Sequence, residues 1–95
     1  MDTVDWQVLQ EINKHKSLSK AAESLFLSQP AITYRVNKIE EEFGKPLYIR
    51  GRNGTQLNQN GMKLLTFASR MIQFDKDVRQ TMQMNPGADQ ADIEI

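Results

Sequence analysis

The segment from Ser28 to Pro46 constrains the fold most, because it carries a helix start signal, an apolar stripe and a stop signal in that order. Ser28 is a favourable N-cap, and Pro30 falls in the first turn, where its missing N–H costs nothing. Gly44 favours the left-handed conformation that ends many helices. Four apolar residues between these signals fall within about 60° of one another around a helix axis: Ile32, Val36, Ile39 and Phe43. We therefore predict a helix over residues 29–43 with one buried side, which must pack against other elements.

Two shorter helices are predicted ahead of this one. The first has Asp2 or Thr3 as its N-cap and reaches about Lys14. Its inward stripe consists of Trp6, Leu9 and Ile12. The second covers residues 20–25 with Ser19 as its expected N-cap, and its two alanines leave room for a neighbouring helix. Because only about three residues separate it from the next helix, the pair is predicted to form a helix-turn-helix.

A hairpin and a long helix are predicted to follow. Asn53-Gly54 lies between two short β-prone runs, and Asn-Gly in this setting is a strong hairpin signal. Asn58 can cap a final helix over residues 59–84. The predicted fold class is therefore mainly α: a winged helix-turn-helix of three helices plus a two-stranded β-hairpin wing, followed by a long linker and dimerisation helix.

The final helix carries two apolar rows. One row alternates at spacings of three and four, like a coiled-coil seam, and supplies the candidate dimerisation residues Leu64, Phe67, Met71, Phe74 and Val78. The shorter row consists of Leu65, Ala68 and Ile72. A helix of this length spans about 39 Å, which is more than so small a domain can cover. We expect one row to face its own domain and the other to pair two chains in a homodimer; the alternative is a helix lying across its own core.

Charge is distributed unevenly although the chain is neutral overall, with 12 basic and 12 acidic residues. Residues 14–63 carry nine bases and four acids, a net charge of +5, whereas residues 1–13 and 85–95 each carry −3. The predicted helix-turn-helix and wing are therefore basic. This favours a nucleic-acid partner only modestly, because Lys and Arg also serve to solvate surfaces.

Composition excludes several function classes. The chain has no Cys and one His, so it lacks the residues for a disulfide scaffold, a thiolate metal site or a histidine metal cluster. No apolar run is long enough to span a membrane and the N-terminus lacks a signal-peptide core, so we expect a cytoplasmic protein without membrane contact. Glu40, Glu41 and Glu42 fan around one helix and cannot share a site. No catalytic residue, metal or cofactor is predicted in this domain, and the chain is expected not to be an enzyme.

The exposed side of the helix over residues 29–43 is the candidate DNA-reading surface. Its side chains suit contact with base edges: Gln29, Pro30, Thr33, Tyr34 and Asn37. Arg35 and Lys38 can reach phosphates, and Ser28 with the free N–H groups of the first turn can hold one phosphate. The acidic run that follows would repel phosphate. Contact with double-stranded DNA is therefore predicted for the N-terminal half of this helix, which is the half that recognition helices generally place in the major groove.

Much of the chain closely resembles the DNA-binding domain of LysR-type transcriptional regulators. The resemblance is carried by the segments Ser17-Leu18-Ser19-Lys20-Ala21-Ala22-Glu23-Ser24-Leu25, Leu27-Ser28-Gln29-Pro30-Ala31-Ile32-Thr33, Ile39-Glu40, Phe43-Gly44, Pro46-Leu47-Tyr48 and Arg50. It implies a linker helix that pairs two subunits, and a dimer that binds an inverted-repeat operator through successive major grooves. By resemblance, Gln29, Pro30, Thr33 and Tyr34 approach bases, while Ser28, Lys38, Arg50 and Arg52 contact the DNA backbone or belong to the wing.

The predicted organisation has three parts. Residues 1–58 form the DNA-binding domain, residues 59–84 the linker and dimerisation helix, and residues 85–95 a hinge segment. The resemblance implies that the hinge leads to a C-terminal domain that binds a small-molecule effector, and that the full-length protein can form a tetramer. Lys16 and Arg35 stand where the family commonly has Gly and Gln, so the preferred DNA sequence is expected to differ. The alternative function is a winged helix used for protein association without DNA binding.

Overall fold

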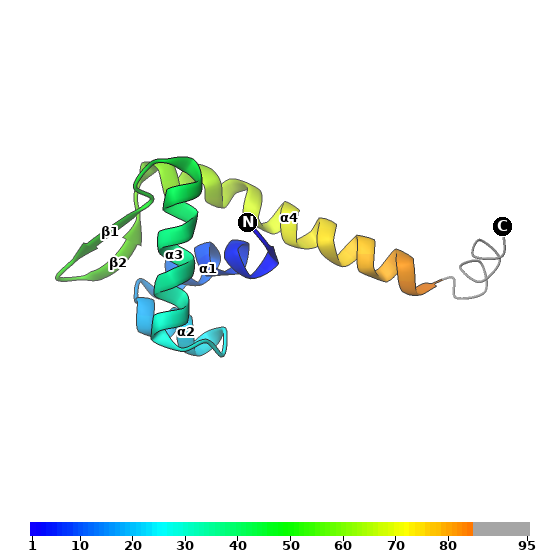
Figure 1. Cartoon of the computed structure of the whole chain (residues 1–95), viewed down its shortest axis with the longest axis horizontal. Coiled ribbons are helices and arrows are strands. Elements are labelled where there is room, and N and C mark those ends of the chain that lie inside the picture. Colours follow the sequence, from blue (N-terminus) through cyan, green and yellow to red (C-terminus); the bar gives the residue numbers. More distant parts are fainter. Residues whose placement is uncertain (85–95) are drawn as a thin grey trace.

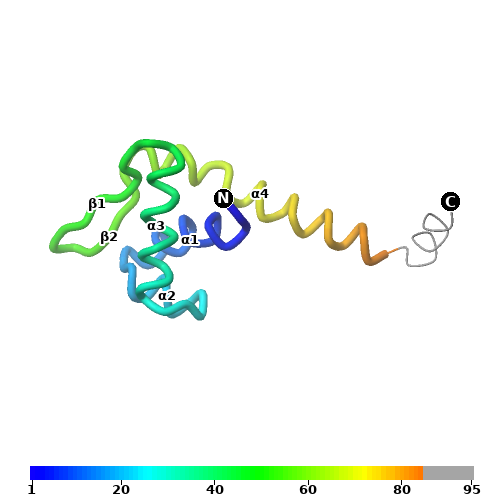
Figure 2. Tube along the Cα trace, viewed as in Figure 1, coloured from blue at the N-terminus to red at the C-terminus, as the bar shows by residue number. Residues whose placement is uncertain are grey.

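Four helices and one hairpin make up residues 1–84, the part of the chain that the computed structural model describes (Figure 1). Their order is α1 (Thr3–His15), α2 (Leu18–Ser24), α3 (Gln29–Phe43), β1 (Tyr48–Gly51), β2 (Gly54–Leu57) and α4 (Gln59–Met84). The first three helices gather into a head, the hairpin projects from one side, and α4 runs away from the head (Figure 2). The predicted fold class, a winged helix-turn-helix followed by a long helix, is confirmed.

Side chains at the N-caps fix where α1 and α3 begin. Asp2 caps α1 in a capping box, in which the Asp5 amide donates to Asp2 Oδ1 at 2.9 Å and the Asp2 amide donates to Asp5 Oδ2 at 3.0 Å. Ser28 caps α3 as predicted, and its Oγ accepts the Ala31 amide at 3.2 Å. Both starts follow from short-range chemistry, because each cap bonds a residue three positions further along the chain.

The predicted cap of α2 is wrong by two residues. Ser17 rather than Ser19 is the N-cap, and its Oγ accepts the Lys20 amide at 3.2 Å. The cause is Lys16, which adopts a left-handed φ of 55° at the end of α1, so that an extended Ser17 follows and the helix begins at Leu18. Ser19 lies within the first turn, where its hydroxyl is 3.2 Å from that of Ser17.

The core lies where α1, α2 and α3 meet. Its side chains have almost no exposed surface: Val8, Leu9, Ile12, Ala21, Ala22, Ile32, Val36 and Ile39. From α2 only the two alanines are buried in this way, so this short helix lies close against its neighbours. Burial at about 25 cal/mol per Å² of apolar surface therefore fixes α3 on the head mainly through one narrow stripe.

Phe43 does not belong to this core, contrary to the prediction. Its side chain is 43% exposed, whereas Ile32 and Val36 are buried in the cluster shared with α1. Phe43 stands in the last turn of α3, directly before Gly44, which turns the chain with a φ of 63°. It lines a shallow surface groove that continues onto the first turns of α4. The apolar stripe of α3 thus runs past the end of the core that covers it.

The β1–β2 hairpin confirms the predicted wing, with a small difference at its turn. The strands pair antiparallel, and Gly51 stands opposite Gly54. Arg52 and Asn53 therefore form the turn, and the glycine of the Asn-Gly signal is the first residue of β2. Gly54 has a φ of 99°, so the positive φ that favours glycine occurs at the first residue of β2 rather than at the centre of the turn.

The backbone of Lys16 holds the start of β2. The Thr55 amide donates to the Lys16 carbonyl oxygen at 3.2 Å. A Cβ added to Gly54 would lie 2.1 Å from the same oxygen, far inside van der Waals contact. Glycine is therefore needed for the wing to approach the loop between α1 and α2 this closely. The wing and the helix-turn-helix consequently form one unit.

The long helix begins and packs as predicted. Asn58 is its N-cap, because the Gly61 amide donates to Asn58 Oδ1 at 2.9 Å. Ala68 and Ile72 are buried against the head, and Leu65 packs at the edge of the core. The shorter apolar row therefore faces its own domain.

Candidate nucleic-acid interface

The outward side of α3 presents a row of polar and aromatic side chains. We call this row the α3 surface, and it consists of Gln29, Pro30, Thr33, Tyr34, Asn37 and Lys38. Thr33 is half-buried and the others are exposed, with Tyr34 at 63%. At 100° per residue the six positions fall within about half a turn of the helix axis. The structure thus brings these predicted base-reading and phosphate-reaching residues together on one accessible side of α3.

Lys38 and Tyr34 interact with each other on the α3 surface. The Lys38 ammonium lies 5.6 Å from the centre of the Tyr34 ring, a cation–π distance, and the two residues are one helical turn apart. This contact restricts a long flexible side chain. The positive charge is therefore held beside an aromatic ring that is itself free to pack against a partner.

The N-terminus of α3 has fewer free donors than predicted. The Ser28 Oγ already accepts the Ala31 amide, and the Ile32 amide donates to the Ser28 carbonyl at 3.1 Å. Pro30 has no N–H to offer. Within the described residues this leaves the Gln29 amide and the hydroxyl proton of Ser28 to donate to an anion.

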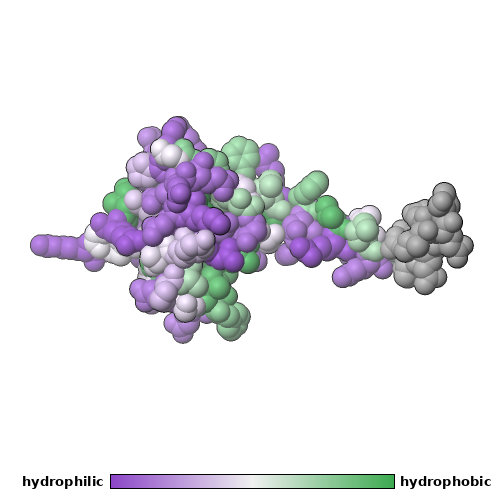
Figure 3. Space-filling model, in the orientation of Figure 1, coloured by the Kyte–Doolittle hydropathy of each residue, from purple (hydrophilic) through white to green (hydrophobic). Residues whose placement is uncertain are grey.

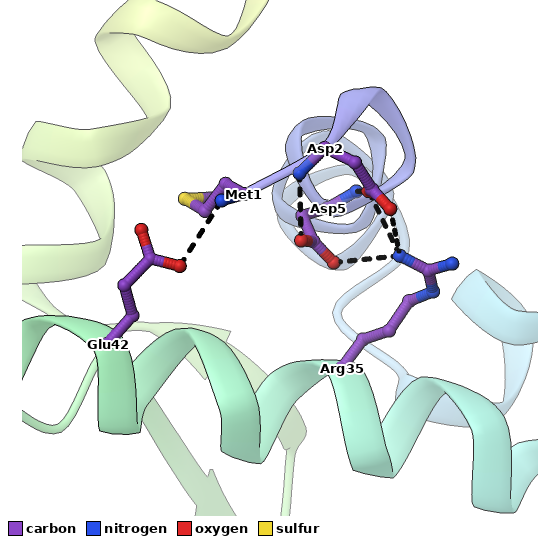
Figure 4. Close-up of polar contacts among 5 residues, drawn as sticks. All are labelled: Met1, Asp2, Asp5, Arg35 and Glu42. Atoms are coloured by element: carbon purple, nitrogen blue, oxygen red, sulfur yellow. Dashed lines mark hydrogen bonds and ion pairs between the residues drawn. The ribbon is translucent and has the colours of Figure 1, made fainter.

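Arg35 turns away from the α3 surface toward the start of α1 (Figure 4). Its Nη1 lies 3.0 Å from both carboxylate oxygens of Asp2 and 3.0 Å from Oδ1 of Asp5. The hydrogen bond to Asp2 raises the pKa of the guanidinium above its ordinary value. Burial raises the pKa of the Asp2 carboxyl, but the Asp5 amide and Arg35 lower it by more, so the net pKa lies below its ordinary value. The side chain predicted to reach a phosphate is thus engaged inside the molecule.

The acidic run at the end of α3 is divided between different partners. Glu40 Oε2 accepts the Leu47 amide at 2.8 Å and so secures the turn after the helix. Glu42 Oε1 lies 3.2 Å from the Met1 amine (Figure 4). Glu41 is exposed. The three carboxylates have separate surroundings, as expected for residues that fan around one helix.

The two predicted wing arginines are exposed. Arg50 lies in β1 and Arg52 in the turn of the hairpin. The hairpin projects from the head, and Figure 3 shows its tip as strongly hydrophilic. Both charged side chains are therefore accessible to a partner.

The outward side of α4 carries a row of exposed apolar residues. We call it the α4 stripe, and it consists of Phe67, Met71, Phe74 and Val78. Phe74 is 67% exposed, and green hydrophobic surface follows α4 in Figure 3. Leu64, predicted as part of the same seam, is half-buried and packs against the core of its own domain. So long an apolar row on a projecting helix is typical of a surface that meets a partner.

The sequence gives no sign of the residues that hold Arg35 and the wing in place. Asp2 and Asp5 were recognisable only as an N-cap pattern, and nothing local indicated that they also hold Arg35. Nothing in the sequence around Lys16 indicates that its backbone carbonyl anchors the wing. Over residues 1–84 there is neither a cluster of metal-ligating side chains nor a helix long and apolar enough to cross a membrane.

Comparison with known sequences identifies the group to which these features belong. A sequence model described as "Bacterial regulatory helix-turn-helix protein, lysR family" matches residues 4–62. The HTH-type transcriptional regulator YraN of Bacillus subtilis (strain 168) is 42% identical over 79 residues, which is 83% of this chain and 27% of that protein. The HTH-type transcriptional regulator HdfR of Escherichia coli O139:H28 is 35% identical over 72 residues, or 76% of this chain and 26% of that protein. The chain thus spans about a quarter of the length of these relatives.

Solved structures share the fold. The CbnR DNA-binding domain in its DNA complex superposes with a TM-score of 0.79 at 23% identity, covering 87% of this chain and 95% of that one. The BenM DNA-binding domain in complex with benA site 1 DNA gives a TM-score of 0.76 at 24% identity, covering 92% of this chain and 99% of that one. Both likenesses cover most of this chain.

Proposed function

Because the chain belongs to the LysR family of bacterial helix-turn-helix regulatory proteins, we propose that it binds double-stranded DNA with sequence specificity. The observation that carries this proposal is the α3 surface. It offers hydrogen-bonding, aromatic and cationic side chains along the exposed side of α3 from Gln29 to Lys38, which is an arrangement that fits a major groove. Gln29, Thr33 and Tyr34 are assigned to base edges, and Lys38 with Ser28 to phosphates.

The hairpin extends this interface. Arg50 and Arg52 are exposed on an element that is tied to the helix-turn-helix through Lys16. We assign them to the backbone flanking the groove that α3 enters. Phosphate contacts of this kind fix the orientation of a protein on DNA without reading sequence.

We further propose that two chains pair through the α4 stripe. Phe67, Met71 and Phe74 repeat at the spacing of a coiled-coil seam and are exposed in the single chain. A dimer with two-fold symmetry presents two α3 surfaces and so suits an inverted repeat whose half-sites lie about 34 Å apart, one turn of DNA. A tetramer of the full-length protein and a small-molecule effector on a further domain stay predictions. Residues 85–95, expected to be the hinge, lie outside the described residues.

The proposal is tested by selecting bound sequences from random duplex DNA and titrating the affinity with salt. Affinity should fall steeply as salt rises, and the selected sites should be inverted repeats. No binding to duplex DNA at low salt would refute the proposal and favour the alternative function, protein association.

Two substitutions separate the assigned roles. Thr33→Ala should relax the base preference at one position, while Lys38→Ala should weaken all sequences alike and reduce the salt slope by about 0.9. Lys76→Ala is the matched control, because it removes an exposed lysine from α4, away from the α3 surface. Equal effects of Thr33→Ala on selected and random DNA would contradict the assignment of Thr33 to a base.

A further inference from the structure

Arg35 is held by two carboxylates at the start of α1, those of Asp2 and Asp5. Its Nη1 donates at 3.0 Å to Asp2 and at 3.0 Å to Asp5, so a different position of the guanidinium would break at least one of these hydrogen bonds. The Arg35 side chain is 28% exposed and that of Asp5 only 16% exposed. We call these three residues the Arg35 clamp (Figure 4). It joins α3 to the start of α1, and Arg35 is 33 residues from Asp2 and 30 residues from Asp5 along the chain.

The two carboxylates are themselves fixed before they meet Arg35. In the capping box each accepts the backbone amide of the other, at 2.9 and 3.0 Å. This bond to the backbone restricts the rotamer of each side chain. Asp5 then offers its second oxygen to Arg35, and Asp2 offers both of its oxygens. The start of α1 is therefore a preformed receptor for one guanidinium.

The charge of Arg35 is more than neutralised where it stands. Two carboxylates surround one guanidinium, and the pKa of the guanidinium is raised by them. To reach a DNA phosphate, Arg35 would have to leave three hydrogen bonds and expose two acids to the same phosphate. A phosphate contact by Arg35 is therefore disfavoured, although its neighbours Tyr34 and Lys38 lie on the α3 surface.

We propose that Arg35 is a positioning residue that sets DNA specificity without touching DNA. The clamp ties the middle of α3 to the start of α1 and so fixes the orientation in which the α3 surface meets the bases. This inference rests on the proposed function. Residues that hold a binding surface without touching the ligand commonly change its affinity by about 2- to 30-fold when altered.

The test compares Arg35→Gln, the double variant Asp2→Asn/Asp5→Asn, and the variant that combines all three changes. Asn caps a helix as well as Asp, so the double variant removes the charges of the clamp and leaves the capping acceptors in place. The measured quantity is the ratio of affinities for a selected site and for random duplex DNA. General electrostatic attraction contributes to both affinities, so its change largely cancels in this ratio.

Each variant should lower the ratio by about tenfold, and the triple variant should lower it no further, because all of them break the same clamp. The salt slope should be unchanged in Arg35→Gln. Direct contact predicts the opposite: Arg35→Gln would reduce the salt slope by about 0.9, and freeing Arg35 in the double variant would raise affinity for both DNAs. An unchanged or higher ratio in the double variant would overturn the proposal.

Arg79→Gln is the matched control. It breaks an Arg–Asp ion pair of similar length, 2.9 Å to Asp75, on α4, and should leave the ratio unchanged. Asp5→Asn alone is the milder variant for use if Arg35→Gln does not fold, and it should lower the ratio in part. If the unaltered protein binds no DNA, the proposed function fails, and thermal unfolding then tests the clamp alone. The loss of Tm in Arg35→Gln should shrink in the Asn background, and additive losses would refute the clamp.

Discussion

Replacing Gly54 by Ala should detach the wing from the rest of the head. Gly54 has a φ of 99°, and a side chain at positive φ costs about 1–2 kcal/mol. The added Cβ would also lie 2.1 Å from the Lys16 carbonyl oxygen, so the strand must move and the 3.2 Å bond from Thr55 to that oxygen is lost. Losing this bond adds about 0.5–1.5 kcal/mol, which brings the expected destabilisation to about 1.5–3.5 kcal/mol.

Thermal unfolding followed by circular dichroism measures this loss. For a domain of this size about 1 kcal/mol corresponds to about 4–8 °C, so Gly54→Ala should lower Tm by about 6–28 °C. Affinity for DNA should fall as well, because the wing arginines lose their fixed position relative to α3.

Two other glycines make the experiment selective. Gly51 stands opposite Gly54 in the hairpin, lacks a positive φ and has open space for a Cβ, so Gly51→Ala should change stability by less than about 0.5 kcal/mol. Gly44 has a φ of 63° but equally open space, so Gly44→Ala should cost only the strain of a side chain at positive φ, about 1–2 kcal/mol. If Gly54→Ala were no worse than Gly44→Ala, close contact with Lys16 would not be what requires the glycine.

Three further predictions concern the dimer, a buried hydroxyl and an acid-sensitive ion pair. Phe74→Asp should shift sedimentation from dimer to monomer, while Gln80→Asp, also exposed on α4, should not; an unchanged mass for Phe74→Asp would rule out the α4 stripe as the interface. Tyr48→Phe should raise Tm, because within the described residues the buried Tyr48 hydroxyl has no hydrogen-bond partner and such a group costs about 1–3 kcal/mol. Burial and then the nearby carboxylates raise the Tyr48 pKa, so the stability of the unaltered protein should fall above the usual tyrosine pKa of 10.0, and that of the Phe variant should fall less. The Asp2 carboxyl has a folded-state pKa below its usual 3.8, so its contribution to stability is complete above pH 3.8 and is lost as the pH falls through the folded-state pKa. The difference in Tm between the unaltered protein and Asp2→Asn should therefore shrink in acid. A difference in Tm that stays constant with pH would contradict this prediction.

The elements that sequence reasoning placed correctly are those set by short-range chemistry. Ser28, Gly44 and Asn58 act on residues a few positions away, so their roles are visible in the sequence before any tertiary structure is known. The division of α4 into a covered row and an exposed row also follows from helical spacing, because Ala68 and Phe67 necessarily point in different directions.

The errors arise where distant segments decide. Ser19 is as good a capping residue as Ser17, and only the left-handed Lys16 selects between them. Phe43 continues the apolar spacing of α3, but the packing partners end before it does. The place of Arg35 on α3 predicts a phosphate contact, which stays a prediction, and gives no sign of the acids 30 and 33 residues away that hold its side chain. Periodicity reports which side of a helix is apolar and carries no information on such partners.

Because α4 is long, the way two α4 stripes pair in a dimer would set the distance between the two heads as well as hold them together. Each helical residue advances about 1.5 Å, so sliding one helix along its partner by one heptad displaces the two heads by about 10.5 Å. At about 3.4 Å per base pair, that displacement corresponds to about three base pairs of half-site spacing. In a dimer built on this stripe, the register of its four apolar side chains selects which operator spacings can be occupied. These side chains lie more than 20 residues from α3 in the sequence.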